Sequence, residues 1–282
     1  MAGKAKRFFK LMFSNNNLRV GFILLTCLVL VAVFADQIGG GDPKTIYDDV
    51  LAAPGEAGHL LGTDGLGRDL FSLLIHGSRT SLRIGIVAAS ISAVMGTLLG
   101  GLSGYFGGKL DAVISEVINI FMMTPTFFLI LIIVALFGSS IFNVMIVIGL
   151  TSWTGNARLM RAQAISIKQR TFVKSAKALG QRDMVILFKH VIPNGIFPII
   201  ANTTMNISSS ILTEAGLSFL GLGDPNVTSW GKIIFSGKVY LPDSWWICTI
   251  SGIAIILTVY TFFMIGDGLN RVLSPKLSAL NQ

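Results

Sequence analysis

The chain has 282 residues, of which 52% are apolar and only 13%, 36 side chains in all, carry a formal charge. That charged share is about half that of a typical soluble domain, and the mean hydropathy is +0.72. The composition excludes a disordered chain, a disulfide scaffold and most soluble enzymes, and it favours an integral membrane protein.

Six runs of about 20 mainly apolar residues, the length that crosses a bilayer as a helix, predict an all-α membrane protein with six transmembrane helices. The runs cover residues 18–35, 82–105, 112–137, 142–158, 196–219 and 247–269. The first run is slightly long for the apolar part of a signal peptide, so we expect it to remain as an uncleaved anchor. Pro125 falls inside the third run and predicts a kink there.

The charges fall in separate segments of the chain. Residues 1–19 hold five Lys or Arg and no acid, and residues 158–190 hold eight against one acid, Asp183. Residues 36–80 hold seven acids and three basic residues. Because cytoplasmic loops are enriched in Lys and Arg, we expect the two basic segments in the cytoplasm and the acidic segment on the other side of the membrane. Nucleic-acid binding by the basic loop is disfavoured by the hydropathy and by this alternation of sides.

These expectations define the organisation of the chain in the lipid bilayer. The predicted parts are a cytoplasmic segment 1–17, a first helix 18–35, an extracytoplasmic segment 36–81, a five-helix core 82–270 with a cytoplasmic loop 159–195, and a cytoplasmic tail 271–282. Both termini are therefore expected in the cytoplasm, because six crossings return the chain to the side on which it began.

The long basic loop contains TFVKSAKALGQRDMVILFKHVIPN, which predicts two short helices. The first covers residues 172–179 and is closed by Gly180, and the second covers residues 183–191 and is stopped by residues 192–194. A helix, a glycine turn and a second helix form a rigid projection that a cytoplasmic partner can bind. An ordinary amphipathic connector is the alternative, although long ordered loops are usually functional.

The spacing from Gly180 to Pro193, with Ala176 four residues before the glycine, resembles the EAA loop of bacterial ABC importer permeases, the segment that docks on the ATPase subunits. The chain departs from the family pattern at Lys174, where Glu is usual, and at His190, where Ile is usual. The resemblance assigns to this coupling loop Phe172, Val173, Lys174, Ser175, Ala176, Lys177, Ala178, Leu179, Gly180, Asp183, His190, Ile192, Pro193 and Asn194.

Further segments resemble the permeases of the dipeptide, oligopeptide and nickel importer family, and the chain is similar to the C-type subunit. These segments are residues 59–85, GYFGG at 104–108, 212–231 and IGDGL at 265–269. Within the first of them three glycines allow tight turns and three charged residues can pair locally; they are Gly62, Gly65, Gly67, Asp64, Arg68 and Asp69. Charge pairing inside the helices does not transfer from the family, because the chain differs from it at Glu116, Asn119, Asn270 and Ser274.

The resemblance implies a type I ABC importer permease fold and a function as half of the path for peptides or peptide-like solutes in a bacterial inner membrane. It implies a second homologous permease, two cytoplasmic ATPases and an extracytoplasmic solute-binding protein as partners. The chain lacks the phosphate-binding pattern G-x-x-x-x-G-K-[ST], so we expect no enzymatic activity and no cofactor in it, with ATP and Mg bound by the partners. Residues 36–58 are expected either to meet the binding protein or to form a solvated loop.

Other functions stay open at this point. One alternative is a permease of the same family whose solute is a nickel complex, a metallophore or an oligosaccharide. A channel or secondary transporter that works alone predicts an inverted repeat with two broken helices, and no such pair is visible. A membrane-embedded enzyme needs a catalytic motif in the spans, and none is visible.

Polar residues recur at steps of three and four in the fifth run, which places them on one stripe of a helix. They are Asn202, Asn206, Ser209 or Ser210, and Thr213. Such a stripe either lines the translocation path or joins neighbouring helices. Glu214 and Glu116 lie nearest to span interiors, where each either faces the solute or pairs with a Lys or Arg. The histidines His59, His76 and His190 lack metal-ligand spacing, so we expect no metal site.

Overall fold

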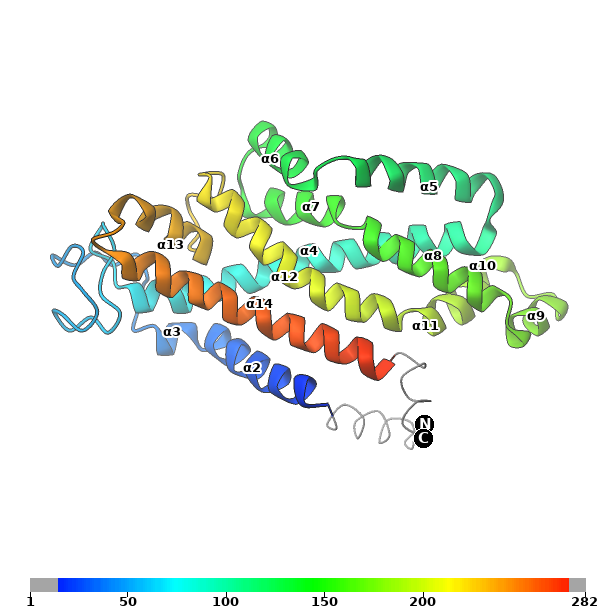
Figure 1. Cartoon of the computed structure of the whole chain (residues 1–282), viewed down its shortest axis with the longest axis horizontal. Helices are drawn as coiled ribbons and strands as arrows, with labels where there is room; N and C mark the ends of the chain where they lie inside the picture. Colours follow the sequence, from blue (N-terminus) through cyan, green and yellow to red (C-terminus); the bar gives the residue numbers. More distant parts are fainter. Residues whose placement is uncertain (1–14, 274–282) are drawn as a thin grey trace.

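The computed structural model describes residues 15–273, so most of the predicted cytoplasmic N-terminal segment and of the predicted tail lies outside the described residues. The described chain is an elongated helical bundle without β-strands (Figure 1). Its longer helices are α2 (Asn16–Val33), α4 (Leu70–Phe106), α12 (Phe197–Phe219) and α14 (Trp245–Leu273). The shorter ones are α3 (Ala35–Ile38), α5 (Gly108–Met123), α6 (Thr126–Phe137), α7 (Ile141–Thr151), α8 (Thr154–Lys168), α9 (Thr171–Ala178), α10 (Asp183–Ile186), α11 (Ile192–Gly195) and α13 (Trp230–Gly237).

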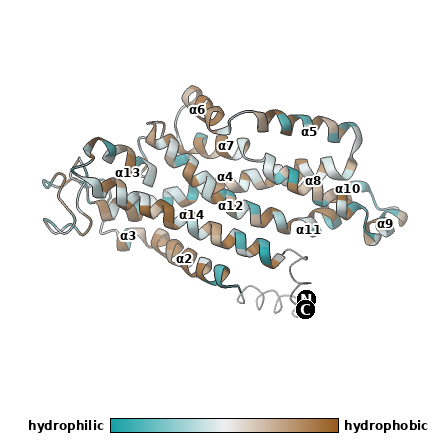
Figure 2. Ribbon diagram, in the orientation of Figure 1, coloured by the Kyte–Doolittle hydropathy of each residue, from teal (hydrophilic) through white to brown (hydrophobic). Residues whose placement is uncertain are grey.

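Three helices, α2, α4 and α14, are each long and apolar enough to cross a membrane. Two bent pairs, α5 with α6 and residues 183–195 with α12, raise the number of candidate spans in the described chain to five. Hydrophobic residues recur along these helices (Figure 2), and many of their large apolar side chains are exposed, as expected where the surroundings are lipid. Helix α4 begins at Leu70, well before the predicted residue 82, because the Asp69 carboxylate accepts a hydrogen bond from the Ser72 N–H at 2.7 Å and caps it.

The third and fourth apolar runs do not form single straight helices. Helices α5 and α6 meet at 86° on either side of Pro125. This confirms the predicted kink, and the angle is large enough to divide the run into two separate helices. The prediction of one helix over residues 142–158 is wrong, because the chain turns between α7 and α8. There the hydroxyls of Thr151 and Ser152 donate to carbonyl oxygens of the preceding turn, at 2.8 and 2.7 Å.

Helix α4 occupies the middle of the bundle, and α8 packs closely along it (Figure 1). Three glycines of α4, Gly96, Gly100 and Gly104, are spaced at four residues and face the backbone of α8. A Cβ at Gly100 would overlap the carbonyl oxygen of Ala157, so the two helices can approach this closely only because the side chain is absent. Small residues at this spacing are the usual means of close packing between membrane helices.

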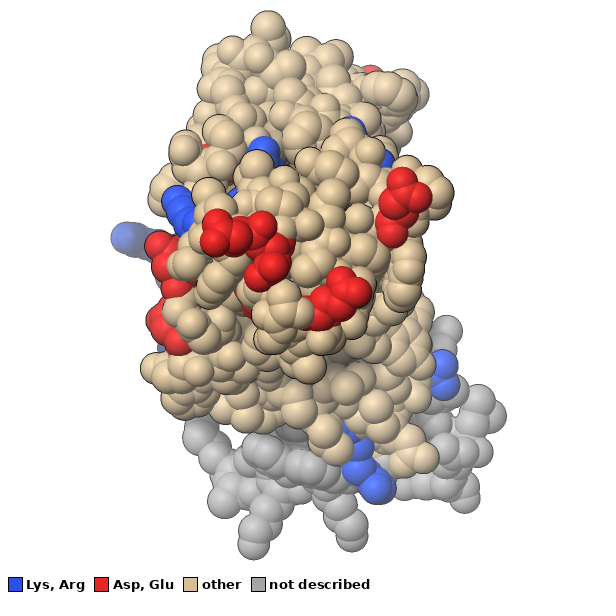
Figure 3. Space-filling model, turned by 90° about the vertical axis from the view of Figure 1, so that its left-hand side faces the viewer, with Lys and Arg blue, Asp and Glu red and all other residues tan. Residues whose placement is uncertain are grey.

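The long axis of the bundle has two chemically different ends. Residues 39–69 and α13 lie at one end, called here the loop end, and α9 lies at the other, called the α9 end (Figure 1). Figure 3 looks onto the loop end, where acidic side chains gather at the surface. The exposed acids there include Asp42, Asp48, Asp49 and Glu56.

Candidate functional site

The segment at the α9 end has the predicted helix, glycine turn and helix. Helix α9 ends in a turn in which the N–H of Gly180 donates to the carbonyl of Lys177 at 3.0 Å and the N–H of Gln181 donates to that of Ala176 at 3.2 Å. This pair of bonds is the Schellman arrangement, and it requires a left-handed residue at Gly180, whose φ is +77°. The predicted first helix and its glycine stop are confirmed.

The predicted stop of the second helix at residues 192–194 is wrong. Helix α10 passes through a π-helical turn (Leu187–Val191) into α11, so helical backbone continues to Gly195. In the wider turn the N–H of Ile192 donates to the carbonyl of Leu187, five residues back. The Asn194 side chain donates to the His190 carbonyl at 2.6 Å. This local change lets the helix pass through Pro193, which lacks an N–H.

One face of the segment is buried against the bundle. Val173 and Ala176 of α9 are buried in an apolar cluster with Tyr105 of α4, Met160 of α8 and Ile186 of α10. Ala176, the residue that the family pattern singles out, therefore lies where a small side chain meets a close-packed surface. This packing fixes α9 to the rest of the molecule.

The other face of the segment is exposed and apolar. We call its exposed apolar residues the α9-end patch; they are Phe172, Leu179, Met184, Val185 and Phe188. Leu179 is 83% exposed at the tip of the glycine turn. Five basic residues of the same segment are also exposed. They are Arg170, Lys174, Lys177, Arg182 and Lys189. An apolar patch with a charged rim is typical of a protein-binding surface.

The remaining residues assigned to the coupling loop lie around this patch. Ser175, Ala178, Pro193 and Asn194 are exposed, and Ile192 is half-buried. The His190 ring lies 3.1 Å from the side-chain oxygen of Gln181, so it joins the two helices across the turn. The segment thus brings together a buried anchor and an exposed face, and its role as an ATPase dock stays a prediction.

A polar network that the sequence did not predict ties this segment to the bundle. The Tyr105 hydroxyl donates to Asp183 at 2.7 Å, and the Lys168 ammonium donates to the backbone carbonyl of Tyr105 at 2.6 Å. Arg161 of α8 binds Asp111 of α5 through two hydrogen bonds of 2.6 and 2.7 Å. The Ser103 hydroxyl also donates to Asp111.

The predicted polar stripe of α12 separates into different environments. The Asn202 amide donates to the side-chain oxygen of Asn156 at 2.9 Å, so it joins α12 to α8. Thr213 donates to its own helix, at the carbonyl of Ser209, at 2.8 Å. Ser209 is exposed and Asn206 is half-buried, whereas Ser210 is buried. Helix contact therefore accounts for Asn202, and a place in the path stays a prediction for Asn206, Ser209 and Thr213.

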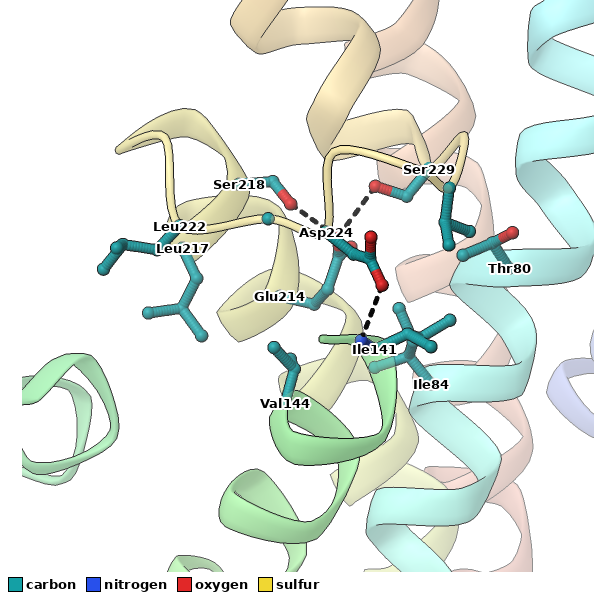
Figure 4. A pocket seen from close by; sticks show the side chains of 12 residues that line it. Thr80, Ile84, Ile141, Val144, Glu214, Leu217, Ser218, Leu222, Asp224 and Ser229 are labelled. Carbon is teal, nitrogen blue, oxygen red and sulfur yellow. Dashed lines mark hydrogen bonds between the residues drawn. The ribbon is translucent and has the colours of Figure 1, made fainter. Parts of the chain in front are cut away.

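Glu214 lies in a buried site between α12 and the loop that follows it (Figure 4). One carboxylate oxygen accepts hydrogen bonds from Ser218 and Ser229, at 2.7 and 2.8 Å, while the other has no protein partner. The side chain is only 5% exposed and borders a cavity of about 10 Å³, room for about one water molecule. Asp224 borders the same cavity and accepts from the N–H of Ile141 at 3.0 Å. Within the described chain Glu214 forms no ion pair with Lys or Arg.

The other predicted residues lie elsewhere. Glu116 is exposed on α5. The His59 ring lies 2.9 Å from Asp69, and the His76 ring lies 3.3 Å from Asp36. Together with His190 these are separate local contacts, and the described residues contain no group of three or more His, Cys, Asp or Glu placed to hold a metal.

The segment before α4 folds as predicted. Gly62 and Gly67 have φ values of +81° and +75°. Asp64 pairs with Arg68, whose Nε donates at 2.8 Å, and Asp69 caps α4. At Gly65 the ring of Tyr240 occupies the place of a side chain.

The family pattern of the binding-protein-dependent transport system inner membrane component matches residues 96–279. The chain belongs to this family. It is 35% identical to the probable D,D-dipeptide transport system permease protein DdpC of Escherichia coli (strain K12), over 90% of this chain and 86% of that protein. It is 35% identical to the dipeptide transport system permease protein DppC of Alkalihalophilus pseudofirmus, over 96% and 90%, and 32% identical to the oligopeptide transport system permease protein OppC of Bacillus subtilis (strain 168), over 94% and 87%.

The fold has a counterpart among solved structures. The chain is similar to the inward-facing methionine ABC transporter MetNI, with a TM-score of 0.57 and 20% identity, over 72% of this chain and 96% of that one. This likeness supports the type I ABC permease fold. As a member of the family, the chain is an integral membrane component of a binding-protein-dependent transport system, and the relatives named here are transport permeases.

The sequence predicted the helix, the glycine turn and the second helix of this segment but not its attachment to the bundle. GYFGG at residues 104–108 was noticed as a family feature, but nothing in it indicates that Tyr105 binds Asp183, which is 78 residues away. Asn156 was also missed, because its partners Ser92, Thr203 and Asn202 come from two other helices. The one feature of the sequence that could have indicated a role for Asn156 is that its amide interrupts an apolar run.

Proposed function

We propose that this permease is one of the two membrane subunits of an ABC importer for peptides or peptide-like solutes and forms half of the translocation path. The observation that carries the proposal is the α9-end patch, an exposed apolar surface held rigidly by a buried anchor and a glycine turn. Relatives named as dipeptide, D,D-dipeptide and oligopeptide permeases, similar over most of the chain, support the solute class.

The α9-end patch is the proposed dock for a cytoplasmic ATPase. Apolar side chains such as Leu179 and Phe188 would enter a groove of the partner, while the surrounding Lys and Arg would meet acidic residues at its rim. Two ATPases and a second homologous permease complete the proposed assembly. ATP binding can shift the permease between states only if the ATPase pair binds those states with different affinity.

The proposed orientation puts the α9 end in the cytoplasm and the loop end outside the bacterial inner membrane. The basic residues of segment 158–190 and the acids of segment 36–80 support it, because cytoplasmic loops carry the excess of Lys and Arg. Six crossings are proposed, with α7 and α8 together forming a broken fourth crossing. The acidic loop end is then the side that meets the solute-binding protein.

The first test is affinity purification of the tagged chain from its native membrane in mild detergent, with identification of co-purifying proteins and an ATPase assay. A second permease and ATPase subunits are expected in the purified material. A variant with Leu179→Asp and Phe188→Asp should lose the ATPases and keep the second permease, and Leu60→Asp at the exposed loop end is the matched control. A chain that purifies alone and moves solute in liposomes would overturn the proposal.

The solute class needs its own experiment. The complete importer in liposomes, with its binding protein, is offered di- and oligopeptides, nickel complexes and oligosaccharides in competition. Peptide uptake driven by ATP supports the proposal. Uptake of a nickel complex or an oligosaccharide instead would contradict the proposed solute class but remain consistent with an ATP-driven importer.

A further inference from the structure

Tyr105 stands at the point where three helices meet, at the α9 end. It is the penultimate residue of α4 and only 2% exposed. Its hydroxyl binds Asp183 at the start of α10, its carbonyl binds Lys168 at the end of α8, and the Lys168 ammonium also lies 5.5 Å from the centre of its ring. A single residue, through its hydroxyl and its backbone carbonyl, therefore joins α4 to the elements on both sides of α9.

The Tyr105–Asp183 contact is directional, unlike the apolar packing around it. The cluster of Val173, Ala176 and Ile186 holds the segment by burial, which permits small sliding movements. A hydrogen bond from a phenol to a carboxylate weakens steeply when distance or angle changes. The bond therefore fixes the position of α10 relative to α4 more narrowly than the packing does.

The neighbouring Arg161–Asp111 pair holds the other side of the same turn. Both carboxylate oxygens of Asp111 are engaged by Arg161, which fixes the first turn of α5 against α8. Tyr105 and Asp111 flank the turn between α4 and α5, so this turn is clamped at two points. A displacement of α10 cannot leave the end of α4 in place unless the Tyr105 bond breaks.

Helix α4 extends from this clamp to the loop end, where Asp69 caps its start. The docking segment is joined by the chain itself to α8 on one side and to α12 on the other. The Tyr105 bond adds a directional link to α4, which is remote in sequence and otherwise meets the segment through apolar packing. A movement imposed on α10 would thus be passed to the central helix of the bundle as well as to its neighbours.

We infer that Tyr105 is a positioning residue for energy coupling, whose hydrogen bond to Asp183 links the movement of the docking segment to α4. This inference rests on the proposed docking of an ATPase at the α9 end. Tyr105→Phe removes one oxygen atom and leaves the buried ring, and Asp183→Asn keeps the shape and removes the charge. Loss of a hydrogen bond to a charged group changes an equilibrium by about tenfold or more.

The test uses the complete importer in liposomes, with its ATPases and binding protein, and measures solute transported per ATP hydrolysed. Tyr105→Phe is expected to lower this ratio about tenfold, with ATPase subunits still bound in normal amount. Asp183→Asn should lower it similarly, and the double variant should be no worse than Asp183→Asn. Tyr260→Phe, on the exposed surface of α14, is the matched control and should leave the ratio unchanged.

A purely structural role predicts another pattern, because a destabilised permease lowers transport and ATP hydrolysis together and keeps their ratio. An unchanged ratio in Tyr105→Phe, or additive losses in the double variant, would overturn the inference. If the unmodified chain binds no ATPase at all, the proposed function fails instead. The two failures are therefore distinguishable in one set of preparations.

Discussion

Gly180 offers the sharpest test of the proposed docking segment, because the structure requires it for its backbone conformation and for no contact with a neighbour. Its φ is +77°, and a Cβ built there meets nothing within 4 Å. A substitution at this position therefore strains the backbone without a clash against any neighbour. Three variants grade this strain: Gly180→Asn, which tolerates the left-handed region, Gly180→Ala, and Gly180→Val, whose branched side chain tolerates it least.

The expected magnitude follows from the cost of a left-handed conformation. Ala at such a position costs about 1–2 kcal/mol, Asn less, and Val more. Because about 1.4 kcal/mol is a tenfold change in an equilibrium, Gly180→Ala should leave the docking conformation about five- to thirtyfold less populated relative to a rearranged turn. The Schellman bonds of Gly180 and Gln181 would be lost in that rearrangement.

The assay measures ATPase subunits bound per permease and ATP-driven uptake by the reconstituted importer. We expect both to fall in the order Gly, Asn, Ala, Val, with the amount of inserted permease unchanged. Gly40→Val is the matched control, because Gly40 has a similar φ of +73°, also without neighbours, at the loop end. Equal losses for Asn and Val would show that a side chain at the interface, rather than backbone strain, causes the effect. Normal uptake by Gly180→Val would refute the reasoning altogether.

Three further outcomes are expected, each read from thermal unfolding of the purified permease. Gly100→Ala should destabilise the contact of α4 with α8 by about 1–3 kcal/mol, whereas Gly252→Ala, which meets nothing within 4 Å, should not. Glu214→Gln keeps an oxygen that can accept from Ser218 and Ser229, so it should be tolerated, while Glu214→Ala should cost about 1–3 kcal/mol; the reverse order would contradict this. The hydrogen bond from Arg79 holds the pKa of Asp36 below its usual range, so the stabilisation it gives is present at neutral pH and lost as acid protonates Asp36 below about pH 4. The unfolding temperatures of the unmodified permease and Asp36→Asn should therefore converge there.

The apolar runs predicted where helices form, and they failed where helices break. Hydropathy reports how well a segment tolerates lipid and carries little information on backbone direction. The kink at Pro125 was predictable because proline lacks an N–H, whereas the helix is interrupted at Ser152 and Trp153 without a proline or a glycine there. Thr and Ser occur inside straight helices as well, as in α12, so their presence at residues 151 and 152 gave no signal of a break.

Local motifs were predicted better than contacts between helices. The turn at Gly180 and the pairing of Asp64 with Arg68 involve residues within a few positions of one another, and residue type and spacing are enough to indicate them. The Tyr105–Asp183 bond and the Gly100–Ala157 contact depend on which helices become neighbours. A single sequence specifies those neighbours only through the complete packing of the bundle.

The polar stripe of α12 shows why residues of a translocation path are hard to predict from residue type and spacing. A polar side chain can serve a passing solute only if its hydrogen-bonding capacity is not already used by the protein. Asn202 is bound by Asn156, and Ser208 donates to the carbonyl of Val259 on α14 at 2.9 Å. Both residues hold helices together, although Asn202 belongs to the predicted stripe and both side chains are of the polar types that line paths. The exposed and half-buried positions, Ser209 and Asn206, retain the freedom to face a solute. Asn206→Leu should therefore change solute selection in the uptake assay more than Asn202→Leu does.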